Sequence, residues 1–510
     1  MKNQLTKARK LTTANQINLI LYSYCLVLFS YVLYRACSVS FTYDEVSTIH
    51  MANSEKWANL DHSSNNHFLN ILLIKACLLF FDPSDLVYRL PNVLGFTLFL
   101  TYAVKIGKLL KPSAPYFSAI LLTSTPFILD FFGLSRGYGL ALAFILASIY
   151  FLLKYCGENK IKFGIASLLF GILAVFSNFT SFNYFVPSLF ILFGYTLFSK
   201  EKVISKTLIL AVITGAFLYY ILPVVFQLKN IGELFFGGRT SLYHDTILSL
   251  SQTFAYHKLN ISFSNIVFST LFLIATIFSF VNILSAIRKK CFDIKVVLSV
   301  LFFLSLLSPV AQHIIFDTSF PTGRTALLYY PILILALVNG MNNTFVWMQD
   351  KFIALIAYSF LVHLMLTSNF THCYSWRFDS GSKEVVSILM EENNQKENNS
   401  NVITIGIDYL YNPSISYHRD SYSFNQLVPH EVVQCWEYDM DIEELNPKYY
   451  GNMITRKNNL TREEADKIVS TNYDYYYLND FVIKELSRHG YCVHVKKQII
   501  SAGASLVTLK

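Results

Sequence analysis

Long apolar runs fill the first two thirds of the chain and constrain what it can fold into. They recur from Ile17 to about Ser368. At 1.5 Å per residue, a helical run of about 17 or more residues crosses a hydrocarbon core of roughly 30 Å. Of the 510 residues, 53% are hydrophobic and 15% are charged, against about 25% charged in a typical soluble domain. The pattern predicts an α-helical polytopic membrane protein.

The apolar runs predict about eleven transmembrane helices. They are expected near 17–39, 89–110, 114–131, 138–155, 161–178, 182–199, 206–226, 261–287, 296–316, 324–340 and 352–368. Another apolar stretch, His67–Phe81, is only 15 residues long and contains Lys75. It is therefore expected to form an interfacial or re-entrant helix rather than a span.

The composition changes after Ser368. Residues 1–368 carry 27 Lys and Arg against 14 Asp and Glu, whereas residues 369–510 carry 14 against 19. We therefore expect a transmembrane domain over 1–368, whose outer loop 40–88 holds the interfacial helix 67–81. A soluble α/β domain is expected over 369–510.

Basic residues of the first part cluster in short connections between the apolar runs. An N-terminus in the cytoplasm places 18 of the 27 on the cytoplasmic side, as the positive-inside rule requires. The net charge of +8 is thus explained by topology and does not indicate nucleic-acid binding. The C-terminal domain is then extracytoplasmic, and we expect it in the periplasm of a bacterium with the spans in the inner membrane.

Alternating and amphipathic patterns in the tail predict a mixed α/β fold. Strands are expected at 401–407, 473–478 and 505–509. A helix is expected at 461–470, where two glutamates occupy the first turn. The polar stretch 391–400 is expected to be a linker.

Two adjacent carboxylates, Asp44 and Glu45, follow the first apolar run. A charged residue inside a membrane helix costs roughly 2.5–3.5 kcal/mol, so the pair is expected at or beyond the outer boundary. One interpretation is that the pair only begins a solvated loop. The other is that it supplies a catalytic base at the membrane surface, where partial burial raises the pKa of a carboxylate.

Four further elements follow the carboxylate pair in order. They are His67 at the start of the apolar stretch, Arg89-Leu-Pro91, the turn Arg136-Gly-Tyr138, and residues 320–331 around Arg324. This order resembles the GT-C superfamily of polyprenyl-phosphate-sugar glycosyltransferases, especially its protein O-mannosyltransferase and aminoarabinose transferase branch. In that family the helix begins with His-Pro-Pro and the turn reads Arg-Pro-Tyr, whereas this chain has Phe68 and Gly137 at the second positions.

The resemblance implies an inverting glycosyltransferase that moves a sugar from a polyprenyl-phosphate donor to a lipid, glycan or protein hydroxyl on the extracytoplasmic face. Asp44 would be the base, with Glu45 assisting it. The candidate phosphate and substrate ligands are Arg136, Tyr138, Arg324, His67, Arg89, Lys229 and Arg239. Arg136 and Arg324 could alternatively extend to the lipid head groups, Arg89 could anchor the outer loop, and Lys229 and Arg239 could contact only lipid.

The family sometimes uses a divalent ion, and Mg²⁺ or Mn²⁺ with Glu45 and His67 as ligands is the corresponding hypothesis. No standard metal-ligand spacing supports it, including that of Asp61 and His62. The alternatives are a transporter or flippase of lipid-linked sugars, a ligase or polymerase of lipid-linked glycans, and a non-catalytic assembly protein whose tail binds a partner. A transporter more naturally carries charged residues inside its spans and internal repeats.

Overall fold

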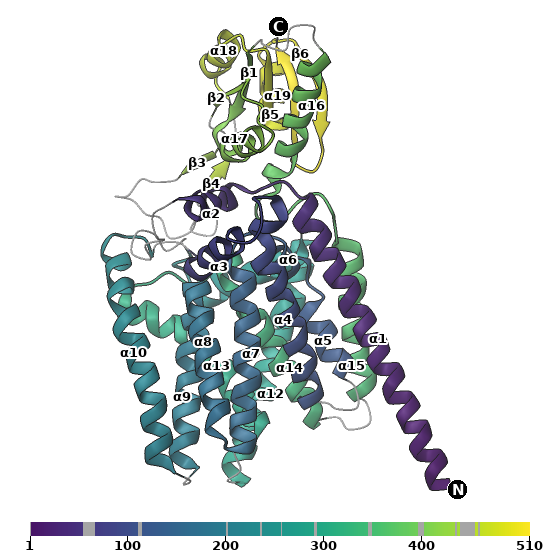
Figure 1. Ribbon diagram of the computed structural model, residues 1–510, viewed down its shortest axis with the longest axis vertical. Coiled ribbons are helices and arrows are strands. Elements are labelled where there is room, and N and C mark those ends of the chain that lie inside the picture. Colours follow the sequence, from purple (N-terminus) through teal and green to yellow (C-terminus); the bar gives the residue numbers. More distant parts are fainter. Residues whose placement is uncertain are drawn as a thin grey trace. The chain divides into compact units, whose positions relative to one another are not determined.

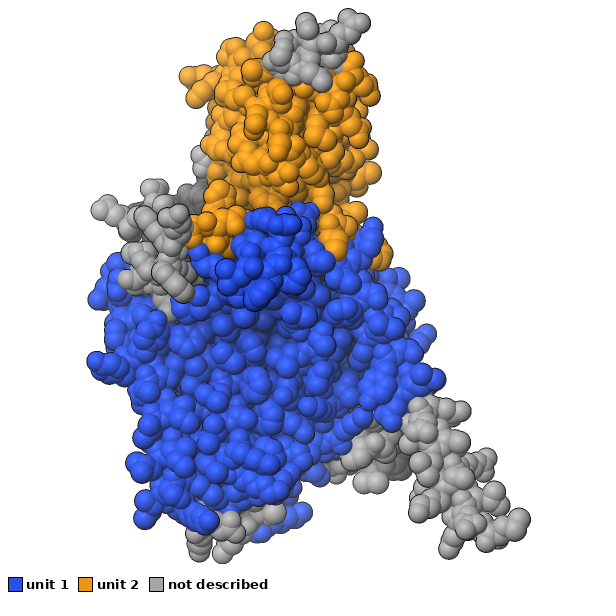
Figure 2. Space-filling model, in the orientation of Figure 1, with its two compact units in different colours: residues 1–36, 56–368 blue, residues 37–55, 369–510 orange. Residues whose placement is uncertain are grey.

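The computed structural model describes residues 2–54, 67–110, 115–199, 202–234, 237–256, 258–289, 293–344, 349–395, 402–433, 436–438, 454–456 and 460–509 (Figure 1). The chain divides into two compact units (Figure 2). The membrane unit comprises Met1–Ala36 and Lys56–Ser368. The C-terminal unit comprises Asn369–Lys510 together with the short segment Cys37–Glu55. The tail therefore folds with a segment taken from the other end of the chain.

The membrane unit is helical. Its α-helices are α1 (Lys2–Ser38), α3 (Phe68–Leu78), α4 (Asp85–Leu110), α5 (Pro115–Thr123), α6 (Pro126–Phe132), α7 (Gly137–Glu158), α8 (Ile161–Ser177), α9 (Phe182–Phe198), α10 (Val203–Asn230), α11 (Leu248–Ala255), α12 (Ile261–Lys289), α13 (Ile294–Phe316), α14 (Tyr329–Thr344) and α15 (Gln349–Thr367). Single turns of other helix types are η1 (Phe179–Ser181), η2 (Leu242–Ile247) and η3 (Gly323–Ala326).

Eight helices in the described residues are long and apolar enough to cross a membrane. They are Asn18–Ser38, Asp85–Leu110, Gly137–Glu158, Phe179–Phe198, Val203–Asn230, Ile261–Lys289, Ile294–Phe316 and Gly323–Gly340. Shorter apolar helices are Phe68–Leu78, Ile161–Ser177 and Ala354–Thr367. The protein is thus a polytopic helical membrane protein.

The predicted continuous helix at 114–131 is wrong. Two short helices, α5 and α6, replace it and are separated at Ser124 and Thr125. Thr125 is extended, with φ −127° and ψ 111°, and Pro126 is the first residue of α6. A residue before proline avoids the helical conformation because the ring crowds its backbone, so the helix restarts after the break.

Among the described spanning helices, only the Gly323–Gly340 segment is more deeply buried than α7. Helix α7 packs against α4 and α8, and 78% of the residues in its most apolar 18-residue stretch are buried. Only 22% of the corresponding window of α10 is buried, and large apolar side chains such as Ile204 and Tyr219 are exposed along it. Exposed apolar side chains on a spanning helix face lipid, where their exposure carries no hydrophobic penalty.

The C-terminal unit is a layered α/β fold. Its helices are α2 (Tyr43–Asn53), α16 (Ser382–Gln395), α17 (Asn412–Ser421), α18 (Arg462–Ser470) and α19 (Asp480–Arg488), with single turns η4 (Arg377–Gly381) and η5 (Tyr409–Tyr411). Its strands are β1 (Ile403–Asp408), β2 (Leu427–Val433), β3 (Trp436–Tyr438), β4 (Ile454–Arg456), β5 (Tyr475–Asn479), β6 (Val493–Ile499) and β7 (Ala504–Leu509).

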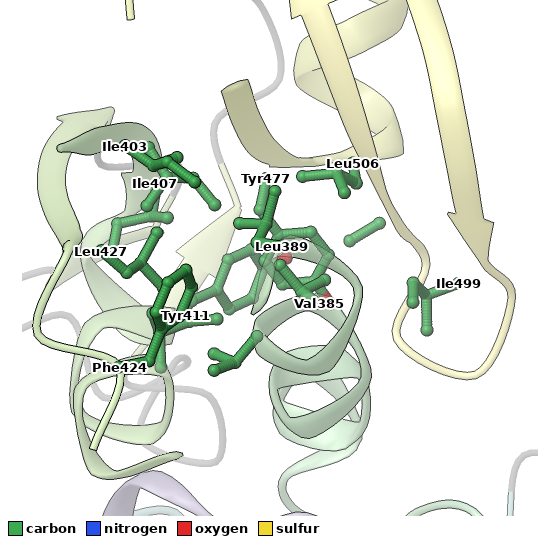
Figure 3. Packing of buried hydrophobic residues seen from close by; sticks show 14 of the residues in the cluster. Val385, Leu389, Ile403, Ile407, Tyr411, Phe424, Leu427, Tyr477, Ile499 and Leu506 are labelled. Atoms are coloured by element: carbon green, nitrogen blue, oxygen red, sulfur yellow. The ribbon is translucent and has the colours of Figure 1, made fainter. Parts of the chain in front are cut away.

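Five of these strands form one sheet in the order β2-β1-β5-β7-β6. The β1 strand is parallel to β2 and β5, while β7 is antiparallel to β5 and β6. Alternation along β5 sends Tyr477 to one face and Tyr476 to the other. Tyr477 lies in one buried cluster with Leu389 of α16 and Tyr411 of η5 (Figure 3). Tyr476 packs on the opposite face with residues of α18 and α19.

The structure confirms the predicted strands as β1, β5 and β7, and the predicted helix at 461–470 as α18. Thr461 caps α18 in a capping box with Glu464. The linker predicted at 391–400 is wrong in its first half, because α16 continues to Gln395. The polar composition of this stretch does not indicate a helix, yet α16 includes its first half and buries Asn393, which is 3% exposed.

A buried ion pair joins two helices of the membrane unit. Nη2 of Arg35 in α1 donates to Oδ1 of Asp130 in α6 at 2.6 Å, and both side chains are 2% exposed. The Tyr256 hydroxyl donates to Oδ2 of the same carboxylate at 2.8 Å. Because an isolated charge in this environment is very unfavourable, each partner makes the burial of the other tolerable.

Replacing Arg35 by Met, or Asp130 by Leu, is expected to lower the free energy of unfolding by about 3–5 kcal/mol, because each change removes the opposite charge that offsets the burial of the remaining one. The double variant should lose less than the sum. Glu158→Gln, which breaks the surface pairs with Lys154 and Lys160, is the control and should change the stability far less. Denaturant or thermal unfolding in detergent measures the difference, and an Arg35→Met variant as stable as the control would contradict the assignment.

Candidate active site

His67 lies directly before α3 and is almost fully buried. Its Nδ1 donates to the carbonyl oxygen of Ser177 at 3.0 Å, and 3% of the residue is exposed. Its Nε2 is buried without a hydrogen-bond partner among the described residues. Since Nδ1 carries the proton in the neutral ring, Nε2 presents a lone pair that can accept a hydrogen bond.

Two arginines lie close enough to His67 to act on its charge. Burial lowers the pKa of His67 well below 6.5, and the guanidinium groups of Arg136 and Arg324 lower it further. Arg136 is the residue before α7 and is 1% exposed, while Arg324 lies half-buried in η3. The membrane unit thus brings together three residues that the sequence predicted separately, which we call the arginine–histidine cluster.

The residue after Arg136 must be glycine because the chain is crowded there. A Cβ atom at Gly137 would collide with the carbonyl oxygen of Ser177 and lie 2.8 Å from Nδ1 of His67. The next residue, Tyr138, packs edge-on against the His67 ring with centroids 4.9 Å apart. The glycine that departs from the family's Arg-Pro-Tyr turn therefore lets α7 approach His67 closely.

Asparagine and serine side chains fix the turn that precedes Arg136. Nδ2 of Asn92 donates to Oδ1 of Asn70 at 2.8 Å, and Nδ2 of Asn70 donates to the carbonyl oxygen of Ser135 at 3.0 Å. The Ser135 hydroxyl in turn donates to the carbonyl oxygen of Tyr88 at 2.9 Å. All three donor side chains are fully buried, so this network holds α3, α4 and the turn in one geometry.

Arg89 occupies a different environment from the arginine–histidine cluster. It is fully buried, and its Nη1 donates to the carbonyl oxygen of Ala36 near the end of α1 at 3.0 Å. Carbonyl groups at a helix C-terminus lack intrahelical partners and carry partial negative charge. This contact fits the anchoring alternative for Arg89.

Lys229 and Arg239 are exposed and contact the end of α13. The Lys229 ammonium lies 5.6 Å from the ring centroid of Phe316, and Arg239 lies 4.0 Å from Asp317. Backbone hydrogen bonds pair Gly238 with Phe320, which ties the Arg239 loop to the segment that leads to Arg324. These two basic residues therefore border the Arg324 segment.

The sequence did not predict the buried contacts of Asp130 with Arg35 and Tyr256. Asp130 interrupts the apolar stretch 126–132, and a carboxylate in such a stretch requires a partner. That signal indicates a buried pair without identifying Arg35, which lies 95 residues earlier.

Asp44 and Glu45 belong to the C-terminal unit, in the first turn of α2. The Thr42 hydroxyl accepts from the Glu45 backbone N–H, and the Glu45 carboxylate accepts from the Thr42 N–H at 3.0 Å. Glu45 is therefore part of a capping box that fixes the start of the helix. Asp44, 8% exposed, stands beside it and takes no part in that box.

No group of three or more His, Cys, Asp or Glu side chains able to hold a metal ion occurs in the part of the chain that the structure describes. Glu45 and His67, the candidate ligands, belong to different units. Asp61 and His62 lie outside the described residues. A divalent cofactor therefore stays a prediction.

The overall fold matches known structures, although no protein-family model and no curated protein sequence matches the chain. ArnT from Cupriavidus metallidurans bound to undecaprenyl phosphate is similar to it with a TM-score of 0.52 and 10% sequence identity, over 96% of this chain and 97% of that one. Apo ArnT gives a TM-score of 0.51 and 10% identity, over 97% and 98%. The chain has the GT-C fold of ArnT. This confirms the fold class expected from the order of the motifs.

The lowered pKa of His67 makes the stability of the protein depend on pH. The unfolded chain binds a proton below about pH 6.5 that the folded chain does not bind, so stability falls as pH decreases through this value. Between about pH 7.5 and 5.5 the loss is expected to be about 1 kcal/mol, and His67→Gln should remove it. Thermal unfolding in detergent measures this, with His244→Gln, an exposed histidine, as the control. An unchanged pH dependence in His67→Gln would contradict the assignment.

Proposed function

We propose that the protein is an integral-membrane inverting glycosyltransferase that transfers a sugar from a polyprenyl-phosphate donor to an acceptor hydroxyl on the extracytoplasmic face. The observation that carries this proposal is the convergence of Arg136 and Arg324 on neutral His67. Two guanidinium groups beside an uncharged ring offer the charge-assisted, paired N–H donors that bind a phosphate group. The GT-C fold supports the same conclusion, since one of its structures holds undecaprenyl phosphate.

In this proposal the membrane unit binds the donor. Arg136 and Arg324 contact the phosphate and stabilise the negative charge that develops on it as the sugar departs. The Nε2 lone pair of His67 accepts a hydrogen bond from a substrate hydroxyl, and the Tyr138 ring keeps the imidazole in place. Ser177 fixes the tautomer that leaves Nε2 unprotonated.

Asp44 is the proposed general base. Its carboxylate takes the proton from the acceptor hydroxyl, and the oxygen attacks the anomeric carbon as the bond to the lipid phosphate breaks. Attack opposite the leaving group inverts the configuration at that carbon. Glu45 supports the reaction indirectly through the capping box that fixes the first turn of α2.

Transfer of labelled sugar from undecaprenyl-phosphate donors to a membrane extract, by purified protein in detergent, tests the proposal. Asp44→Asn is expected to lower the rate at least about 100-fold, because the amide cannot accept a proton. Glu45→Gln should lose far less, since its amide oxygen still accepts from the Thr42 N–H. Asp420→Asn, at an exposed position, is the control.

Equal rates for the wild type and Asp44→Asn would remove Asp44 as the base. Absence of transfer by the wild-type protein with every donor would overturn the transferase and favour a transporter of lipid-linked sugars. An inverted anomeric centre in the product, read by NMR spectroscopy, is expected for direct displacement, and retention would contradict it.

A further inference from the structure

Residues 40 and 41 are built into the C-terminal unit. Phe41 is fully buried and contacts the Tyr417 ring edge-on, with centroids 4.4 Å apart. The Ser414 hydroxyl donates to the carbonyl oxygen of Phe41 at 2.6 Å, and the Phe41 N–H donates to Nε2 of His418 at 3.4 Å. The Ser40 hydroxyl lies 3.0 Å from the same nitrogen. Helix α17 therefore holds the segment that leads into α2.

Asp379 holds the first residue of α2. Its Oδ2 accepts a hydrogen bond from the Tyr43 N–H at 2.7 Å, and the residue is 1% exposed. Asp379 lies in η4, immediately before α16, whose Val385 and Leu389 belong to the buried core of the unit. A carboxyl group at a helix N-terminus satisfies a backbone donor that has no partner within the helix.

The first turn of α2 is therefore fixed from both sides. The capping box binds the N–H groups of Thr42 and Glu45 from within the segment, and Asp379 binds that of Tyr43 from the body of the unit. Asp44 lies between these bonded positions, so its backbone direction is determined by them.

We propose that Asp379 is a positioning residue that keeps α2, and with it Asp44, a fixed part of the C-terminal unit throughout the reaction cycle. The inference rests on the proposed role of Asp44 as the base. It gives the C-terminal unit a direct task in the reaction, namely to carry and orient the proton acceptor.

The electrostatics agree with this geometry. Burial raises the pKa of Asp379 well above 3.8, and the nearby carboxylates of Asp44 and Glu45 raise it further, while the Tyr43 hydrogen bond opposes the change. The three acidic side chains thus lie together. What the contact with Tyr43 requires is an oxygen that accepts a hydrogen bond, and an asparagine supplies one without the charge.

Two variants separate positioning from general loss of structure. Asp379→Leu removes the acceptor and is expected to lower kcat about 10- to 100-fold while the KM for the lipid-linked donor stays within about 3-fold, because the base is misplaced but the donor site is intact. Asp379→Asn should restore most of kcat, and Asp420→Asn is the matched control. Wild-type kcat in Asp379→Leu would overturn the proposal, as would an equal loss in Asp379→Asn.

Hydrogen exchange of the full chain in detergent tests the same claim without any transfer assay. Amides of α2 are expected to exchange at least about 10-fold faster in Asp379→Leu than in the wild type, and at near wild-type rates in Asp379→Asn. Unchanged protection of α2 in Asp379→Leu would overturn the positioning role. If wild-type protein transfers no sugar but α2 behaves as expected, the transferase proposal fails and the structural assignment stands.

A disulfide tests whether α2 stays in place during turnover. The hydroxyl oxygens of Ser40 and Ser414 are 3.5 Å apart, so Ser40→Cys with Ser414→Cys places two thiols within bonding range. Cys37 is exposed and is replaced by serine in this background. The oxidised protein is expected to keep the activity of the reduced protein. Loss of activity on oxidation and recovery on reduction would overturn the fixed attachment.

Discussion

The absence of water in the hydrocarbon core is the constraint on which the membrane unit depends. Every backbone polar group and every charge there needs a partner supplied by the protein. Helices satisfy the backbone, and the exceptions are informative. The chain breaks its helical pattern at Thr125 because proline follows, and the short α6 that restarts there carries a carboxylate that binds Arg35 and Tyr256.

The charges fall into two groups with different chemistry. In the membrane unit, burial and the charges of Arg136 and Arg324 lower the pKa of His67, and the two guanidinium groups offer donors for a phosphate. In the C-terminal unit, the acidic side chains of Asp44, Glu45 and Asp379 lie close together, and burial raises the pKa of Asp379. The proposed reaction needs both, since a phosphate leaves and a hydroxyl loses its proton.

Hydropathy was sufficient to predict the helical membrane part, because a span requires a long apolar run wherever it occurs in the chain. The order of short motifs correctly indicated the GT-C fold and brought His67, Arg136 and Arg324 under consideration. Their convergence could not be derived, because it depends on the close approach at Gly137 and on the polar network through Asn70 and Ser135.

Other features had no local signal. The segment Cys37–Glu55 folds with the tail through contacts between residues far apart in the chain, such as Phe41 and Tyr417. The domain boundary predicted after Ser368 assigned the segment Cys37–Glu55 to the membrane domain instead. In the sequence, Asp379 is one of many acidic residues of the tail. Its role could not be predicted, because the contact of its carboxyl group with the start of α2 exists only in the folded unit.

Direct binding of undecaprenyl phosphate is the measurement that tests the phosphate site most directly. Native mass spectrometry or radioligand binding in detergent can compare the wild type with Arg136→Met and Arg324→Met. Each variant is expected to weaken binding at least about 10-fold, because a charge-assisted hydrogen bond to phosphate is lost. Lys154→Met, at a partly exposed residue outside the arginine–histidine cluster, should bind like the wild type. Wild-type affinity in both arginine variants would contradict the account.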